Sequence, residues 1–107
     1  MKHSRLGALA GCAALGLSLW AAQGGDAKTG AAVFAQCAVC HNATSGEKKI
    51  GPGMKGLFKK LRFTDGKPMT EANVRARIEA GGKGMPPYRQ LLDAAEKDDL
   101  IAYLKTL

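Results

Sequence analysis

The run Cys37-Ala38-Val39-Cys40-His41 decides how this chain is interpreted, because it brings two thiols and an imidazole together. The whole sequence holds three cysteines and two histidines, so most of its thiol and imidazole groups lie in this run. A length of 107 residues suits one small domain and excludes most multidomain enzymes. The odd number of cysteines argues against a framework of paired disulfides.

The spacing of the two thiols predicts covalent attachment of haem. C-x-x-C-H is the attachment pattern of c-type haem, and Cys37, Cys40 and His41 match it. Two thiols three positions apart at a helix end can add to the two vinyl groups on one edge of a porphyrin. The adjacent imidazole then lies beneath the ring, where it can bind iron. We therefore predict that Cys37 and Cys40 hold one haem c and that His41 is an iron ligand.

Three other interpretations of the two cysteines stay open. A thioredoxin-like redox pair would need a strand–helix–strand context, and the sequence does not show one. Half of a zinc site would need further Cys or His ligands, and residues 25–107 supply none beyond this run. A plain structural disulfide is the third alternative. Haem attachment is the interpretation that we favour.

The first residues have the composition of an export signal. Lys2 and Arg5 precede an uncharged run from Leu6 to Ala22, and small and polar residues follow it. This order is that of a secretory signal peptide, so we expect residues 1–24 to be removed by cleavage near positions 22–25. Residues 25–107 would then form the working domain. Because haem c is attached outside the cytoplasm, this expectation agrees with the haem motif and predicts a periplasmic protein.

Two alternatives for the leader also stay open. The uncharged run lies at the lower limit of length for a membrane-spanning helix, so it could be retained as an anchor. Leu9-Ala10-Gly11-Cys12 also looks like a lipoprotein cleavage box, with Cys12 as the lipidated residue. Most of the apolar run follows Cys12, however, which argues against lipidation. Membrane association is expected only if the run stays uncleaved.

The rest of the chain predicts helices joined by ordered loops. Asp26, Thr70 and Asp93 can each accept hydrogen bonds from free backbone amides at a helix start, and Glu96 completes a capping box with Asp93. The expected helices cover about residues 27–37, 54–61, 71–80 and 94–107. Segments 42–56 and 83–90 are expected to be loops, and 64–68 a turn. No segment alternates well enough for a strand, so the predicted fold class is all-α.

Four segments in order resemble a short bacterial class I cytochrome c over about residues 26–107. They are Gly30, Phe34, Cys37, Cys40 and His41; Gly51-Pro52 with Gly56-Leu57-Phe58; Gly84-Met85-Pro86-Pro87-Tyr88; and the run from Asp99 to Lys105. The resemblance implies a compact cytochrome c fold, with three to five helices around one covalently bound haem. It also implies that Leu100 and Tyr103 pack near Gly30 and Phe34.

The resemblance makes His41 and Met85 the two axial iron ligands. It also implies that the Pro52 carbonyl accepts the second ring N–H of His41, a bond that fixes ring orientation; a mere turn at Gly51-Pro52-Gly53 is the alternative. The residues alone leave the sixth ligand open between a methionine and no ligand. Met54, Met69 and Met85 are the candidates, and Met85 stands out because two prolines restrain its loop.

These features predict an exported monohaem carrier that moves one electron as Fe(III)/Fe(II), and not an enzyme. Histidine and methionine together raise the haem potential, which suits a carrier. The alternatives are a haem c subunit of a periplasmic oxidoreductase complex, or an enzyme or gas sensor with an open iron. We expect a monomer. The sequence does not identify the electron donor or acceptor.

The net charge of the whole chain is +7, from 16 basic and 9 acidic residues. Loss of Lys2 and Arg5 with the leader would lower it to about +5. Several basic residues lie in segments expected near the haem edge: Lys48, Lys49, Lys55, Lys59, Lys60, Arg62, Lys83 and Arg89. They could attract acidic faces of redox proteins, although a merely solvated surface is an equal alternative. Nucleic-acid binding is not expected, because no matching motif is present.

Overall fold

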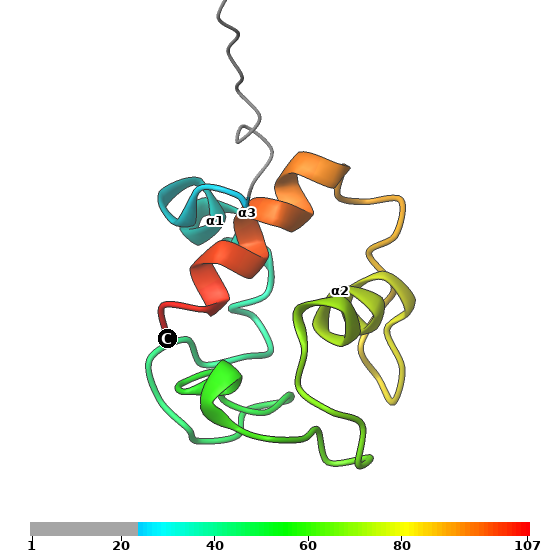
Figure 1. The fold of residues 1–107 in the computed structure, drawn as a ribbon. Coiled ribbons are helices and arrows are strands. Elements are labelled where there is room, and N and C mark those ends of the chain that lie inside the picture. The colour runs from blue at the N-terminus through cyan, green and yellow to red at the C-terminus, as the bar shows by residue number, and fades with distance from the viewer. Residues whose placement is uncertain (1–23) are drawn as a thin grey trace, which may run out of the picture.

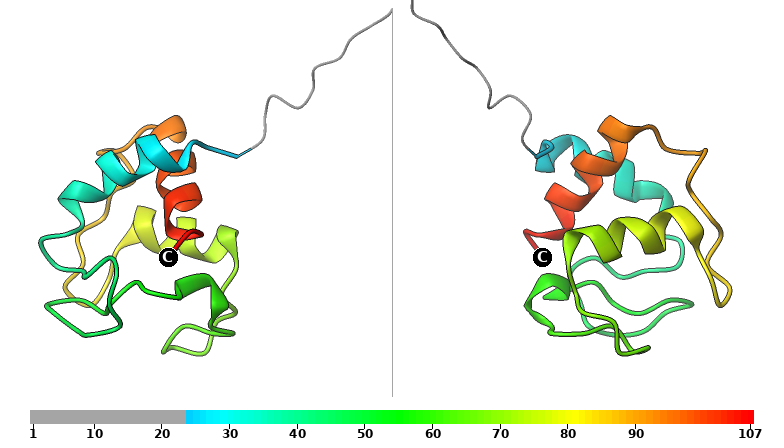
Figure 2. Two further views of the ribbon diagram at one scale, coloured as in Figure 1. Left: turned by 90° about the vertical axis from the view of Figure 1, so that its left-hand side faces the viewer. Right: turned by 45° about the vertical axis from the view of Figure 1, so that its right-hand side comes forward.

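The structure is a computed structural model that describes residues 24–107, so the predicted leader, with Cys12, lies outside the described residues except for Gly24. Its helices are α1 (Ala27–Val33), α2 (Glu71–Ala80) and α3 (Ala94–Leu104), with 3-10 helices at Phe34–Gln36 and Leu57–Lys59. Helices α1 and α3 lie together on one side, α2 lies beside them, and the loops of residues 42–69 close the opposite side (Figures 1 and 2). Residues 24–107 contain isolated β-bridges but no strand. The predicted all-α class is confirmed for this part.

The first helix is shorter than predicted. Asp26 caps it, because its side chain accepts a hydrogen bond of 2.8 Å from the Lys28 amide. After Val33 the chain tightens into the 3-10 helix, where Cys37 N donates to Phe34 O at 2.7 Å. The expected α-helix through Cys37 is therefore wrong in its last turn. Tighter bonding of this kind is common at helix ends.

The bounds of α2 agree with the prediction. Thr70 Oγ1 accepts a bond of 3.0 Å from the Asn73 amide, and Gly81 ends the helix in a conformation with φ 67°. The predicted turn at residues 64–68 is also present, and Arg77 of α2 reaches it by bonding Asp65 at 2.8 Å. The Lys67 amide, and then Arg77, hold the pKa of Asp65 below its ordinary value.

The capping box at the start of α3 is confirmed. Asp93 Oδ1 accepts from the Glu96 amide at 2.8 Å, and Glu96 Oε1 accepts from the Asp93 amide at 2.9 Å. Helix α3 ends at Leu104, short of the predicted Leu107. The helix predicted over residues 54–61 is wrong: only the single 3-10 turn is helical, because Gly56 has a left-handed conformation and Lys60 is already extended.

Helices α1 and α3 approach so closely that their backbones touch at Gly30. A Cβ at Gly30 would overlap the carbonyl of Asp99 and lie 2.8 Å from Tyr103 Cβ. Beyond this point Phe34 packs on Tyr103, with ring centroids 5.5 Å apart. The N-terminal end of α1 is tied to the same helix, since the Asp26 amide donates to Asp99 Oδ1 at 2.8 Å. The close crossing implied for Gly30, Phe34 and Tyr103 is thus present.

The buried core draws side chains from the three helices and from the loops between them. Its members are Val33, Phe34, Met54, Leu57, Val74, Ile78, Leu92, Leu100, Ile101 and Leu104. A second set of apolar residues packs against this core but stays partly exposed, and it includes Cys37, Phe58, Phe63, Met69, Met85 and Tyr88. In the part of the chain that the structure describes, no helix combines the length and hydropathy needed to cross a membrane.

Substitution of Gly30 tests the helix crossing. We expect Gly30→Ala to lower the free energy of unfolding by roughly 1–3 kcal/mol, as overpacking typically does. This loss should appear although alanine favours a helix by about 1 kcal/mol over glycine. Chemical denaturation followed by circular dichroism measures it. Gly46→Ala is the matched control, because a Cβ there meets no atom within 4 Å. Equal stabilities of the two variants would contradict the crossing.

Candidate functional site

Cys37, Cys40 and His41 lie on one turn that follows α1. The amides of Cys40 and His41 both donate to Cys37 O, at 3.0 and 2.9 Å. Both thiols are free and partly exposed. Burial, and then the neighbouring Cys40, raise the pKa of the Cys37 thiol. The turn therefore presents two free thiol groups next to one imidazole.

This geometry does not support the other interpretations of the cysteines. The two thiols are not joined in a disulfide. Among residues 24–107, no group of three or more His, Cys, Asp or Glu side chains is placed to hold a metal ion, so a zinc site finds no partners there. The absence of a strand from the same residues leaves a thioredoxin-like pair without its context.

His41 is held by a hydrogen bond from its Nδ1 to the carbonyl oxygen of Pro52, at 2.7 Å. A carbonyl oxygen can only accept, so Nδ1 carries a proton, and in the neutral ring the free lone pair is then on Nε2. Free Nε2 is the form in which histidine binds a metal, and the bond at Nδ1 fixes the ring. The contact that the family resemblance implied for His41 and Pro52 is present in the structure.

The loop that carries Pro52 is shaped by its glycines. Gly51 N donates to Cys40 O at 2.7 Å, and Met54 N donates to Asn42 O at 2.8 Å, so the loop runs back along the Cys37–His41 turn. A Cβ at Gly51 would lie 2.6 Å from His41 Cε1, and a Cβ at Gly53 would overlap the backbone of the loop itself. Gly51 and Pro52 therefore both lie against the imidazole of His41.

Met85 ends a tight hairpin turn that begins at Gly82. Gly82 N donates to Met85 O at 2.9 Å, and Met85 N donates to Gly82 O at 3.1 Å. The two central residues both have positive φ, 53° at Lys83 and 92° at Gly84, which is the geometry of a type I′ turn. A Cβ at Gly81 would overlap the Met85 carbonyl and lie 2.8 Å from Pro86 C. The backbone around Met85 is thus closely restrained.

The residues that follow Met85 in sequence lie against the last turns of α2. Tyr88 N donates to Ile78 O at 2.9 Å, and Arg89 N donates to Glu79 O at 3.2 Å. Burial raises the pKa of Tyr88, and the thiols of Cys37 and Cys40 raise it further. The loop that follows Met85 therefore lies on the same side of the domain as the two cysteines.

The three candidate methionines differ in burial. Met54 is part of the buried core, so its thioether is enclosed by protein. Met69 and Met85 are both partly buried and pack against that core. Sequence reasoning missed Gly81, which lets the chain pass close to Met85; a run of two glycines directly before Lys83 was the available signal.

The residues present fit a covalently attached haem. The set of donors is two thiols for thioether bonds, an imidazole with a free Nε2, and a half-buried thioether. Large apolar side chains also pack against the core while staying partly exposed, namely Phe58, Phe63, Met69 and Tyr88. An apolar prosthetic group would complete the burial of such side chains. His41 is the one donor whose free nitrogen the hydrogen bonding already determines.

An exposed apolar pair lies beside the Cys37–His41 turn. Val39 is 69% exposed and Ile50 is 72% exposed. The bond from Gly51 N to Cys40 O, and a bond of 2.7 Å from Lys49 Nζ to Ala38 O, place the two segments side by side. All of the basic residues named for the haem edge are exposed. Sequence reasoning missed Val39 and Ile50, because only these two hydrogen bonds show that their segments lie side by side.

Comparison with known proteins gives consistent matches. The family model described as cytochrome C oxidase, cbb3-type, subunit III, matches residues 25–104. The chain is 35% identical over 100 residues to a cytochrome c of Gibberella zeae, covering 77% of this chain and 94% of that protein. It is 35% identical over 97 residues to cytochrome c2 of Blastochloris viridis, covering 75% and 76%. The solved cytochrome c6 of the diatom Phaeodactylum tricornutum matches with a TM-score of 0.60 and 27% identity, covering 77% of this chain and 93% of that chain.

A substitution at Gly51 tests how the imidazole is held. We expect Gly51→Ala to displace His41 from Pro52, because the new Cβ would lie 2.6 Å from Cε1. Exchange of the Nδ1 proton with solvent, followed by NMR, should accelerate about fivefold, in keeping with the roughly 1 kcal/mol that such a bond contributes. Gly46→Ala, in open space, should leave the exchange rate unchanged. An unaltered rate in Gly51→Ala would contradict this role.

Proposed function

Because this chain belongs to the class I c-type cytochromes and carries one covalently bound haem c, we propose that it is an exported carrier of single electrons between redox proteins. When bound, the haem supplies an Fe(III)/Fe(II) couple. The observation that carries the proposal is the His41–Pro52 hydrogen bond of 2.7 Å, which leaves Nε2 free next to the two thiols. The chain itself would attach the haem, orient it and exclude water from it.

We assign a role to each of the candidate site residues. Cys37 and Cys40 would hold the haem through thioether bonds, while His41 and Met85 would be its axial ligands. The free thiols on one turn support the first assignment. The hydrogen bond to Pro52 supports the second for His41, and the type I′ turn supports it for Met85.

Two restrained ligands suit electron transfer better than catalysis. Gly51 lies against the His41 ring, and Gly81 lies against the backbone of Met85. Both ligand-bearing segments are therefore held by backbone contacts that do not depend on the charge of the iron. If His41 and Met85 both bind the iron, no ligand position would be left for a substrate. The proposed protein is accordingly a carrier and not an enzyme or a gas sensor.

The proposed location is the periplasm, after removal of residues 1–24 by cleavage near positions 22–25. The packing of the domain supports this boundary, because a Cβ at Gly25 would overlap the backbone of α3, so residues from Gly25 onward are part of the domain 25–107. The intact mass of the exported protein tests it. A chain that keeps residues 1–24 would contradict cleavage and favour membrane attachment.

The proposed docking surface surrounds Val39 and Ile50. These two side chains are exposed and apolar, and Lys48 and Lys49 directly precede Ile50. An apolar centre with a basic rim fits the acidic face of a redox protein, which it would attract over long range. The proposal is a monomer that meets such partners in turn, with no role for nucleic acid.

A second candidate function is favoured by the family model, which is named for a subunit of an oxidase. In that case the same fold and haem would serve as a fixed subunit of a periplasmic oxidoreductase complex. The relatives favour the free carrier, because the matched proteins are named cytochrome c and cytochrome c2. The kinetics of electron transfer separate the two candidates.

Replacement of the proposed sixth ligand is the main test. We expect Met85→Ala to lose the weak red-edge absorption of the ferric His/Met form, to have a lower reduction potential, and to bind carbon monoxide when reduced. Met69→Ala is the matched control, because Met69 is also partly buried against the core; it should keep the band. Retention of the band in Met85→Ala would show that Met85 is not the ligand.

The dependence on salt tests docking. We expect the second-order rate constant with an acidic redox protein to fall roughly tenfold or more between about 10 mM and 200 mM salt. Lys48→Glu should reduce the rate at low salt more than Lys28→Glu, which makes the same change of charge on α1. A rate that is independent of protein concentration would instead indicate a fixed subunit. Equal effects of the two charge reversals would contradict a docking surface at Lys48.

A further inference from the structure

We propose that the buried Lys97 of α3 is a positioning residue for Met85, because its ammonium group joins both ends of the Met85 loop, residues 81–88, to the helices. This inference rests on the proposed function, in which Met85 is an iron ligand. Lys97 touches neither Met85 nor the haem-binding turn. Its proposed effect passes through Glu79 and the backbone of Arg89.

Lys97 is unusual for its burial. It is 7% exposed, and it is the one charged residue counted as buried in the part of the chain that the structure describes. Lysine is almost never fully buried unless its charge is paired. Here the ammonium nitrogen donates to Glu79 Oε2 at 3.0 Å and to the carbonyl oxygen of Arg89 at 3.1 Å.

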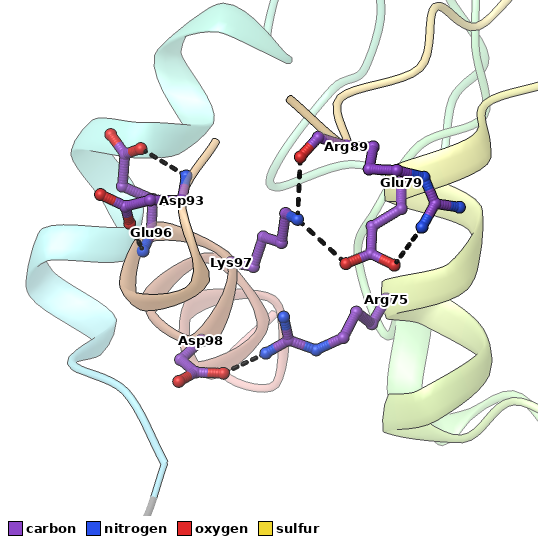
Figure 3. A network of polar contacts seen from close by, with 7 residues as sticks. All are labelled: Arg75, Glu79, Arg89, Asp93, Glu96, Lys97 and Asp98. Atoms are coloured by element: carbon purple, nitrogen blue, oxygen red, sulfur yellow. Dashed lines mark hydrogen bonds and ion pairs between the residues drawn. The ribbon is translucent and has the colours of Figure 1, made fainter. Parts of the chain in front are cut away.

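The two partners of Lys97 lie on either side of the Met85 loop. Glu79 is in the last turn of α2, just before Gly81, where the loop begins. Arg89 directly follows Tyr88, where the loop ends. Figure 3 shows the Lys97 ammonium between the Glu79 carboxylate and the Arg89 carbonyl. The bond from Arg89 N to Glu79 O, at 3.2 Å, closes the same junction through the backbone.

The charges of Lys97, Glu79 and Arg89 favour one placement of the Met85 loop over others. The Arg89 guanidinium lies 3.6 Å from Glu79 Oε1, so the carboxylate is shared between two cations. The hydrogen bond from Lys97 lowers the pKa of Glu79 below its ordinary value. If the loop moved away, the ammonium would lose the Arg89 carbonyl while remaining buried, and a buried donor without its partner is costly. A paired buried charge in this position therefore specifies geometry more than it adds stability.

A second ion pair joins the same two helices and provides a control. Arg75 of α2 bonds Asp98 of α3, next to Lys97 in sequence (Figure 3). The side chains of this pair are 32% and 50% exposed, and no hydrogen bond links them to residues 81–89. Exposed pairs of this kind contribute little to stability. Removal of the Arg75 charge thus perturbs the α2–α3 contact without breaking a hydrogen bond of the loop, although Arg75 also contributes to the lowered pKa of Glu79.

The test is the affinity of the ferric, haem-loaded protein for imidazole, which can bind only when Met85 leaves the iron. The apparent affinity for imidazole is proportional to the fraction of molecules in which Met85 has left the iron. We expect Lys97→Met to raise this affinity about tenfold or more and to weaken the red-edge absorption. Lys97→Arg should restore most of the wild-type behaviour. Arg75→Met, and Arg89→Ala, which keeps the carbonyl acceptor, should each change the affinity by less than about threefold.

A second measurement does not depend on the iron. Hydrogen exchange at the amides of Tyr88 and Arg89, which bond to Ile78 O and Glu79 O, should accelerate at least tenfold in Lys97→Met. The amide of Ala38, which bonds to Phe34 O after the end of α1 and not to α2, should not change relative to the Arg75→Met control. If Lys97→Met fails to fold, Glu79→Gln serves in its place, since it removes the charge that pairs with the ammonium.

The outcomes separate this inference from the function on which it rests. Equal imidazole affinity and equal exchange in Lys97→Met and Arg75→Met would overturn the positioning role while leaving Met85 as the ligand. An imidazole affinity that Met85→Ala does not change would instead overturn the ligand assignment. Uniform acceleration of exchange across the whole domain would show that Lys97 supports the fold in general, and it would also overturn the inference.

Discussion

The contact on which the rest of the structure depends is the crossing of α1 and α3 at Gly30. Because this residue has no side chain, the two backbones meet, and a Cβ would overlap the Asp99 carbonyl. The crossing fixes α1 against α3, and the turn with Cys37, Cys40 and His41 directly follows the 3-10 extension of α1. It also orients α3, whose Lys97 reaches the junction of α2 with the Met85 loop. The segments that carry the proposed ligands, His41 and Met85, are thus both connected to the pair of helices that cross at Gly30.

A glycine next to each of the two proposed axial ligands lets the backbone lie close to it. Gly51 allows the chain to lie against the His41 ring, and Gly81 allows it to lie against the carbonyl of Met85. Around them the small core leaves several large apolar side chains partly exposed. A domain of this size has little apolar material to spare, so a covalently bound haem serves as part of its core. The prosthetic group and the fold stabilise one another.

Much of the fold could be predicted from local patterns. The capping residues Asp26, Thr70 and Asp93 all cap helices, because such bonds involve only neighbouring residues. The predictions failed where a helix ended or never formed. Helix α1 tightens into a 3-10 turn after Val33, α3 stops at Leu104, and residues 54–61 contain a single 3-10 turn. At residues 54–61 the left-handed Gly56, whose amide donates to the Leu107 carbonyl, outweighs local propensity.

The sequence by itself determined the chemistry of the site: the spacing of Cys37, Cys40 and His41 restricts what they can bind, since covalent attachment depends on positions along one turn. It also predicted roles for Pro52 and Met85 through family resemblance. Only the tertiary structure decided how these residues are supported. The role of Gly51 beside His41, the side-by-side placement of the segments that carry Val39 and Ile50, and the burial of Lys97 between Glu79 and Arg89 all depend on residues that are not close neighbours in the chain. Such contacts leave no local pattern, because distance in space, and not spacing in sequence, brings the groups together.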